Sequence, residues 1–238
     1  TAILIPKPLR SILGADLLEL NSLYKVYMLL VTVFCTNSVN ILAGINGLEA
    51  GQTLVIASAV LLFNVQRLAK IIPLPELSAE DIQIRDAQLF SVYITLPLIA
   101  VTAALLIFNY YPSSVFVGDT YTYFAGMALA VCGILGHFTE TLLIFFIPQM
   151  LNFLYSLPQL FKIVPCPRHR LPVYNKATGL LHPSKRSDGG YNLNVVTLFL
   201  RLFGPCTEKQ LCNRILAFQI ACCALGFVVR SLLEGIYK

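Results

Sequence analysis

A long stretch without any charged side chain, from Leu89 to Tyr110, is the feature that most restricts the fold of this chain. A helix that crosses the hydrocarbon core of a bilayer needs about 20 mostly apolar residues, and this stretch supplies them. Of the 238 residues, 57% are hydrophobic and 12% are charged, and the mean hydropathy is +0.74. Soluble domains carry about 25% charged residues. The sequence therefore predicts a membrane protein.

Other apolar stretches have the composition of membrane-spanning helices, although the fourth is short and His137 with Glu140 marks its join to the fifth. The expected spans are 23–42, 49–66, 89–110, 121–137, 139–162 and 211–233. We therefore expect an all-α multi-pass membrane protein of about six transmembrane helices with a small extramembrane subdomain. Its expected parts are residues 1–162, the proline-rich polar segment 163–210, and residues 211–238.

Neither the start of the chain nor its cysteines indicate a secreted protein. The opening residues, Thr1 to Pro8, show no signal-peptide pattern and resemble the middle of a longer sequence. The seven cysteines are scattered and none forms a Cys-x-x-Cys pair. We expect them to be small apolar side chains rather than zinc ligands or disulfides.

Six spans would place successive loops on alternate faces of the membrane. Face A then holds loops 43–49, 111–120 and 163–210, and face B holds residues 1–22, loop 67–88 and the C-terminus. Lysine and arginine divide almost evenly, nine against eight, so they do not set the orientation. Face A has only four of the 12 acidic residues, so the net charge of +5 lies on it. A positive face suits an anionic ligand.

The first polar cluster on face A lies at the end of the first span. Asn37 and Asn40 are three residues apart and share one side of a helix. Amides are costly in lipid unless they meet a partner or a polar cavity. Gly44 and Gly47 follow, and they allow a tight turn and the close approach of a ligand. The alternative is a helix end whose amides link neighbouring helices.

The second cluster is segment 115–120, at the start of the fourth span. Asp119 is either the N-cap of that helix or a hard oxygen ligand for Mg²⁺, and Phe116 offers a flat face to a base. The two interpretations are compatible, because a helix N-terminus also favours nearby anions.

The third cluster is segment 165–172, which contains three prolines. In an extended chain Arg168 and Arg170 point to one side and His169 to the other. Two guanidinium groups on one side make a clamp for a diphosphate. The alternative is a basic segment that holds anionic lipid headgroups. We expect His169 to contact a substrate rather than to act as a catalytic base.

Together the three clusters suggest metal-assisted phosphoryl transfer at one face of the membrane. A transporter is a second class, in which Asn37 and Asn40 would line a path, but it requires polar residues at mid-depth in several spans. A non-catalytic helical partner of another membrane protein is a third. Nucleic-acid binding is not indicated, because the basic residues lack a groove-entering helix or a run of stacking aromatic residues.

At these clusters the sequence resembles a known family. The motifs NILAGINGLEAG (40–51), FVGDT (116–120) and PCPRHR (165–170), with segment 152–159, are similar to the polyprenyl-phosphate sugar-1-phosphate transferase superfamily. Within it, the similarity is greatest to eukaryotic members that act on dolichyl phosphate, and it runs nearly from end to end.

The resemblance implies the C-terminal part of a roughly ten-helix fold. It also implies Mg²⁺-dependent transfer of N-acetylglucosamine-1-phosphate from UDP-GlcNAc to dolichyl phosphate. The products are GlcNAc-diphosphodolichol and UMP, in the first step of N-glycan precursor assembly, and tunicamycin is the expected inhibitor. The expected location is the endoplasmic reticulum membrane, with face A in the cytosol. A homodimer stays open.

The resemblance also assigns roles to single residues. Asn40 and Asp119 would coordinate Mg²⁺, and Asp119, Arg168 and Arg170 would be catalytic. The expected substrate-binding residues are Phe116 on uracil, Asn46 on the uridine, Asn37, and Arg168, His169 and Arg170 on the diphosphate and the sugar.

One feature of that family is missing. Its members carry an adjacent Asp-Asp pair, with a nearby Lys, in an earlier cytosolic loop. The only adjacent acids here are Glu80 and Asp81, which fall on face B. We therefore expect the chain as given to be inactive by itself, and a truncated membrane partner protein is the alternative.

Overall fold

The fold is described by a computed structural model, which covers residues 2–4, 14, 17–73 and 75–237. Much of the expected face B segment 1–22 therefore lies outside the described residues. The described helices are α2 (Ser22–Ile41), α3 (Leu48–Ile71), α4 (Ala79–Asn109), α5 (Asp119–Leu135), α6 (Thr139–Phe145), α7 (Ile147–Leu160), α8 (Val195–Phe203) and α9 (Glu208–Tyr237). The strands are β1 (Ala2–Leu4), β2 (Leu17–Glu19), β3 (Val173–Asn175) and β4 (Leu180–His182). They form two antiparallel pairs, β1 with β2 and β3 with β4.

The prediction of an all-α multi-pass membrane protein is confirmed. Each predicted span falls on α2, α3, α4, α5, the pair α6–α7 or α9. Of the described helices, α2, α3, α4 and α9 are long and apolar enough to cross a membrane, and the pair α6–α7 makes a fifth if its two parts form one span. Helix α5 has 17 residues and is shorter than a typical span.

Apolar side chains on the outside and amides on the inside are what a lipid environment requires. Leu29 on α2 is 61% exposed and Ile107 on α4 is 77% exposed, whereas Gln52 on α3 is 1% exposed. In water this distribution would be unfavourable. In lipid, apolar side chains can face the solvent, and polar groups find partners inside the protein.

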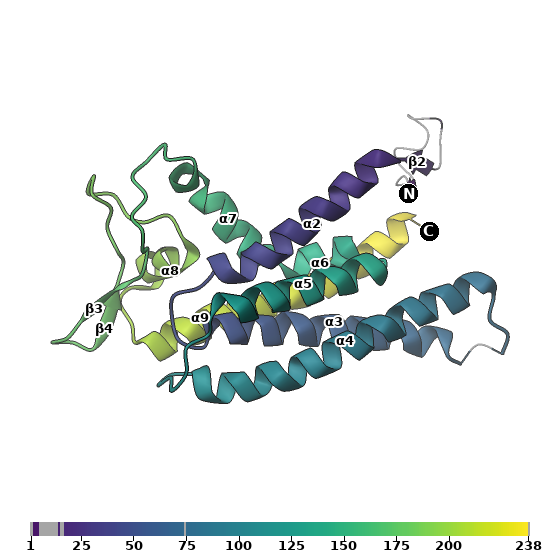
Figure 1. Ribbon diagram of the computed structural model, residues 1–238, viewed down its shortest axis with the longest axis horizontal. Coiled ribbons are helices and arrows are strands. Elements are labelled where there is room, and N and C mark those ends of the chain that lie inside the picture. The colour runs from purple at the N-terminus through teal and green to yellow at the C-terminus, as the bar shows by residue number, and fades with distance from the viewer. Residues whose placement is uncertain (1, 5–13, 15–16, 74, 238) are drawn as a thin grey trace.

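The expected continuous span 139–162 is wrong, because it consists of two helices bent by 70°. Pro148 stands in the first turn of α7. A proline there lacks an N–H group and its ring clashes with the carbonyl four residues earlier, so this position favours a break or a kink in the helix. The bend sends α7 away from the other helices toward the polar segment (Figure 1).

The join predicted at His137 is confirmed, and its geometry shows why α5 ends there. His137 has φ 55°, and the N–H of Phe138 donates to Gly133 O at 2.9 Å. A left-handed residue followed by this hydrogen bond is a Schellman helix ending. Loop 67–88, by contrast, is shorter than predicted, since α3 continues to Ile71 and α4 begins at Ala79.

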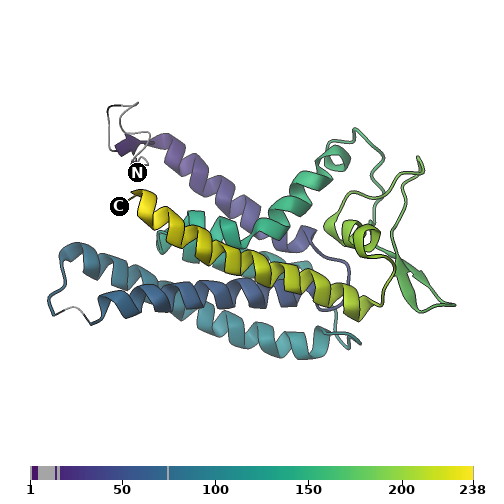
Figure 2. The same ribbon diagram turned by 180° about the vertical axis from the view of Figure 1, so that it is seen from behind.

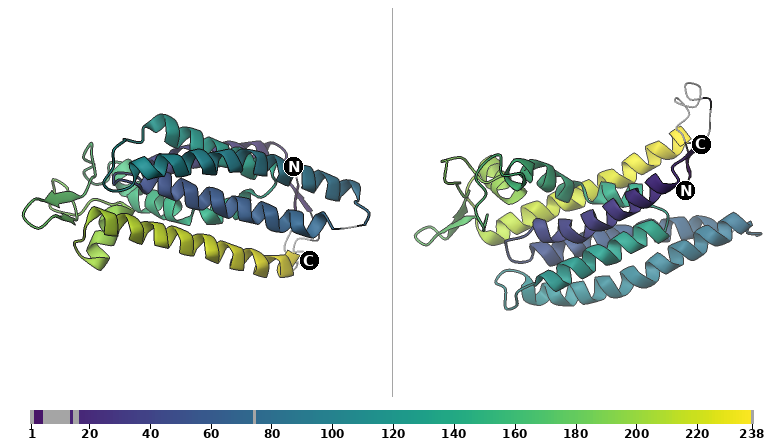
Figure 3. Two further views of the ribbon diagram at one scale, coloured as in Figure 1. Left: turned by 90° about the horizontal axis from the view of Figure 1, so that it is seen from below. Right: turned by 45° about the horizontal axis from the view of Figure 1, so that its top comes forward.

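The connections of the bundle gather at two opposite ends. The α2–α3 and α4–α5 loops, α8 and the β3–β4 hairpin lie at one end, which we call the site end (Figures 1 and 2). The α3–α4 loop and the C-terminus lie at the other, the far end (Figure 3). One apolar core fills the bundle between α2, α3, α5 and α6. A second joins the α2–α3 loop to α8 and the start of α9.

Candidate active site

Asn40 and Asp119, 79 residues apart in the chain, meet at the site end. Asn40 Nδ2 donates to Asp119 Oδ1 at 2.8 Å and to Thr122 Oγ1 at 3.1 Å. Asn40 lies in the last turn of α2, and Asp119 is the first residue of α5. The interpretation of Asp119 as an N-cap is wrong, because Gly118 holds the N-cap position and Asp119 is the first residue of the helix. The Asp119 carboxylate is therefore directed to Asn40.

A cavity of about 310 Å³ is lined by Asn40 and by residues of the third cluster. Arg168, His169 and Arg170 all line it. The chain bends at Arg168 instead of staying extended, and His169 lines the same cavity as the two arginines. The remaining lining residues come from the α2–α3 junction, α7, the start of α8 and the residue after Arg170: Ile41, Leu42, Ala43, Gly44, Asn152, Leu171, Asn194 and Val196.

The third cluster, residues 165–172, which we call the arginine segment, is held by residues that precede α8. Asn194 Nδ2 donates to Arg170 O at 3.0 Å, and Arg170 Nη1 donates to Leu193 O at 3.5 Å. Asn194 also caps α8 by accepting the N–H of Thr197 at 2.7 Å. The N-terminus of α8 therefore lies beside the arginine segment, and both features favour an anion in the cavity.

Helix α7 carries a buried polar stripe that the sequence interpretation missed. Gln149, Asn152, Ser156 and Gln159 are spaced by three or four residues, so they share one face, and none is more than 1% exposed. In a surface helix of a soluble protein the buried face is apolar. A polar stripe at helical spacing inside an apolar segment was the available signal.

The stripe attaches the parts of the cavity to one helix. Asn152 Oδ1 accepts the N–H of Val195 at 2.9 Å, at the start of α8. Ser156 Oγ donates to Leu193 O at 2.7 Å. Gln159 Nε2 donates to Pro165 O at 3.0 Å, at the start of the arginine segment. Helix α7 thus holds both α8 and the arginine segment.

The other predicted site residues do not line this cavity. Asn37 is exposed and donates to Val33 O of its own helix at 2.8 Å. The side chain of Phe116 is 90% exposed in the α4–α5 loop. The backbone N–H of Asn46 donates to Glu208 Oε1 at 2.7 Å, which ties the α2–α3 loop to α9. All three lie at the site end or in the last turns leading to it.

Gly44 allows the α2–α3 loop to touch the arginine segment. Its φ is 107°, and a Cβ atom placed on it would lie 2.6 Å from Leu171 Cδ2. Leu171 follows Arg170 directly, so a side chain at position 44 would displace the Leu171 side chain next to the arginine segment.

We expect the Gly44→Ala substitution to cost about 1–3 kcal/mol of stability through backbone strain and to raise KM for a diphosphate substrate by moving Leu171. Thermal denaturation in detergent and initial rates measure the two effects. Gly179→Ala is the matched control, because Gly179 also has a positive φ of 70° but has no atom near its Cβ position. An equal rise of KM in both variants would contradict this account.

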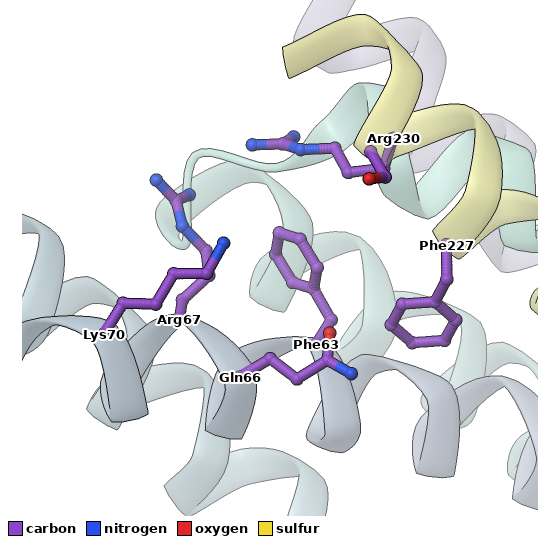
Figure 4. Close-up of a pocket in the computed structure, with 7 residues that line it drawn as sticks. Phe63, Gln66, Arg67, Lys70, Phe227 and Arg230 are labelled. Carbon is purple, nitrogen blue, oxygen red and sulfur yellow. The ribbon is translucent and has the colours of Figure 1, made fainter. Parts of the chain in front are cut away.

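A second cavity, of about 270 Å³, lies at the far end of the bundle. Arg67 and Lys70 reach it from α3, and Arg230 reaches it from α9, around the ring of Phe63 (Figure 4). Both Arg67 and Arg230 place their guanidinium carbon within 6 Å of that ring, at 5.8 Å and 5.3 Å. None of the predicted site residues lines it.

The candidate metal ligands at the site end are few. Among the described residues no group of three or more His, Cys, Asp and Glu side chains could hold a metal ion. Asp119 offers two carboxylate oxygen atoms, and its Oδ1 accepts a hydrogen bond from Nδ2 of Asn40. The amide oxygen of Asn40 is the second hard ligand that this pair could turn toward an ion. Mg²⁺ commonly takes one or two protein carboxylates and fills its remaining positions with water and substrate phosphates. The pair fits that pattern.

The fold and the site define a helical multi-pass membrane protein with a cavity lined by Arg168 and Arg170 at one end. The family model described as glycosyl transferase family 4 matches residues 4–137, and the chain belongs to that family.

Curated relatives extend the match to nearly the whole chain. The chain is 48% identical over 228 residues to UDP-N-acetylglucosamine–dolichyl-phosphate N-acetylglucosaminephosphotransferase of Dictyostelium discoideum, covering 94% of this chain and 54% of that protein. It is 39% identical to the protein of the same name from Saccharomyces cerevisiae, covering 99% and 58%. With the Schizosaccharomyces pombe protein it shares 51% identity over 77% of this chain and 40% of that protein. The chain spans about half the length of the relatives it matches.

Proposed function

We propose that this chain forms part of an enzyme that transfers N-acetylglucosamine-1-phosphate from UDP-GlcNAc to dolichyl phosphate. An oxygen of the dolichyl phosphate attacks the β-phosphorus of UDP-GlcNAc, and the bond from that phosphorus to UMP breaks. The products are GlcNAc-diphosphodolichol and UMP. The observation that carries the proposal is the contact of Asn40 with Asp119 beside a cavity lined by Arg168 and Arg170.

The arginines suit the substrate charge. Phosphoryl transfer depends mainly on positioning and on stabilising the charge of the phosphoryl oxygens. Arg168 and Arg170 bring two guanidinium groups to the cavity, and His169 lines it between them. We assign the two arginines to the diphosphate and His169 to the diphosphate or the sugar. The N-terminus of α8 adds a partial positive charge on the same side.

Asn40 and Asp119 are the residues that would hold Mg²⁺. The ion, when bound, would withdraw charge from the diphosphate. The protein's own contribution is to hold the two ligands together, since they come from helices that are far apart in the sequence. Phe116 and Asn46, on neighbouring loops of the site end, are proposed for the uracil and the uridine, and Asn37 for a substrate contact.

The same proposal sets the location. Dolichyl phosphate is a membrane lipid, and the described helices include four that are apolar and long enough to cross a membrane. We place the protein in the endoplasmic reticulum membrane with the site end toward the cytosol. The positive charge predicted for face A supports an anionic ligand there.

The test is the formation of GlcNAc-diphosphodolichol from UDP-GlcNAc and dolichyl phosphate in detergent, with Mg²⁺ or with excess EDTA. The chain as given is compared with the protein translated from its whole reading frame. We expect the protein of the whole reading frame to make product only with Mg²⁺, and tunicamycin to inhibit it. If both forms fold and neither makes product, the transferase proposal fails and a non-catalytic membrane partner takes its place.

A further inference from the structure

Three buried glutamines form a continuous chain of hydrogen bonds across the bundle, and we call it the glutamine relay. Gln149 on α7 donates through Nε2 to Gln52 Oε1 and to Gln219 Oε1, both at 2.7 Å. Gln52 lies on α3 and Gln219 on α9. Each of the three side chains is 1% exposed. The relay therefore joins three helices through side chains that water does not reach.

Each end of the relay binds backbone carbonyls near a helix terminus. Gln52 Nε2 donates to Val39 O at 3.0 Å and to Leu42 O at 2.8 Å, at the end of α2. Gln219 Nε2 donates to Phe145 O at 2.8 Å, at the break between α6 and α7. The last carbonyls of a helix have no partner within the helix. Inside a membrane protein they need a donor from elsewhere.

The direction of the relay follows from the number of donors. The NH₂ group of Gln52 donates to two carbonyl oxygens, so the side-chain oxygen of Gln52 must face Gln149. The NH₂ group of Gln149 then has to point to Gln52 and to Gln219, and both of its hydrogens are used. Removing one member leaves buried polar groups without a partner, which costs about 1–3 kcal/mol.

At α2 the relay binds backbone carbonyls on both sides of Asn40. Val39 and Leu42, on either side of it in the sequence, are bound by Gln52, and Ile41 O accepts a hydrogen bond from Asn152 at 3.3 Å. Asn40 itself donates to Asp119 at 2.8 Å. Buried amides thus fix the last turn of α2 at the point where the side chain of Asn40 reaches Asp119 of α5.

We infer that Gln52 is a positioning residue that holds Asn40 in register with Asp119, and that the relay couples this pair to the break between α6 and α7. The inference rests on the proposed function, in which Asn40 and Asp119 hold the metal ion. Loss of Gln52 would let the end of α2 shift, and Asn40 would lose its place opposite Asp119. Metal affinity, rather than stability alone, would then fall.

The test measures metal binding directly. Mn²⁺ is used in place of Mg²⁺, with the protein translated from its whole reading frame and in the presence of UDP. Electron paramagnetic resonance measures the concentration of free Mn²⁺, which gives the binding affinity. For Gln52→Leu we expect Mn²⁺ affinity to fall by about 10- to 100-fold, the usual range when a residue that orients a ligand is removed. The Mg²⁺ concentration for half-maximal activity should rise by the same factor.

A graded series and a matched control separate positioning from stability. Gln149→Leu keeps the bonds from Gln52 to Val39 and Leu42, so a smaller loss is expected, and it also serves if Gln52→Leu does not fold. Asn64→Leu is the control, because Asn64 is a fully buried amide on the same helix that donates to Ser91 Oγ at 2.6 Å. It lies about 18 Å further along α3, and its loss should lower thermal stability without changing Mn²⁺ affinity.

Two results would overturn the inference, and they are distinguishable. If the unaltered protein makes product with Mg²⁺ but Gln52→Leu and Gln149→Leu bind Mn²⁺ as the Asn64→Leu control does, only the positioning role fails. If the unaltered protein folds and makes no product, the proposed function fails and the inference fails with it.

Discussion

Replacing Asp119 by asparagine is expected to lower kcat by about 10³-fold, with a much smaller loss of stability. The substitution keeps the size of the side chain and an oxygen that can still accept from Asn40, but it removes the only carboxylate in the Asn40–Asp119 pair. Mg²⁺ is a hard cation that prefers charged oxygen ligands, and groups that stabilise charge in the transition state contribute about 10²–10³ in kcat each. Initial rates at saturating UDP-GlcNAc measure the effect.

Asp188→Asn is the matched control for this prediction. Asp188 lies in the polar segment 163–210, but its carboxylate is paired with Arg186 at 2.9 Å and does not line the cavity. The hydrogen bond from Arg186 holds the pKa of Asp188 below its usual value, so the carboxylate is ionised under assay conditions. We expect the control to keep near-normal activity. Equal activity in both variants would rule out Asp119 as a metal ligand.

Replacing Arg170 by alanine should reduce kcat/KM for UDP-GlcNAc by about 100-fold, and Arg170→Lys should recover only part of that loss. Arg170 lines the cavity and is half-buried, with its backbone carbonyl held by Asn194. A hydrogen bond to a charged group is worth about 1.5–3 kcal/mol, and each 1.4 kcal/mol is tenfold. Lysine keeps the charge but lacks the planar fork that binds two phosphate oxygens.

The control for charge is Arg201→Ala. Arg201 lies on α8, where its guanidinium group packs over the ring of Tyr191 at 4.6 Å and outside the cavity. Its loss changes the net charge by the same amount. A comparable loss of kcat/KM in this variant would mean that the positive charge of the site end acts as a whole, and that Arg170 has no specific contact with the diphosphate.

Helix positions could be predicted from this sequence because the solvent is lipid. A run such as 89–110 has no soluble alternative of that length, and α4 covers it as far as Asn109. The bend in 139–162 could not be derived from hydropathy, because both parts are apolar. Pro148 was the available signal, but a proline inside a membrane helix is often tolerated. Pro97 indeed lies inside α4, which continues through it.

The site shows a similar division. The alternation of the predicted spans placed Asn40, Asp119 and the arginine segment at one face. In the structure Asn40 contacts Asp119 and lines the same cavity as the arginines. This pattern could not show that α3 and α7 bind the backbone around them, because the hydrogen bonds from Gln52 on α3 and from Gln159 on α7 to carbonyls depend on the fold. Nor could it show that His169 lines the same cavity as the arginines, since the chain bends at Arg168. Residues that position others are the hardest to predict from sequence.

The most direct test of the central claim follows the β-phosphate of UDP-GlcNAc. The protein translated from its whole reading frame is incubated with Mg²⁺, dolichyl phosphate and UDP-GlcNAc labelled with ³²P at the β-phosphorus, and the lipid and water-soluble products are separated. Transfer of the sugar with its phosphate predicts label in GlcNAc-diphosphodolichol and unlabelled UMP, with both products formed about 10³-fold more slowly by the Asp119→Asn variant. Label recovered in UDP, with an unlabelled glycolipid, would show transfer of the sugar alone and would contradict the account.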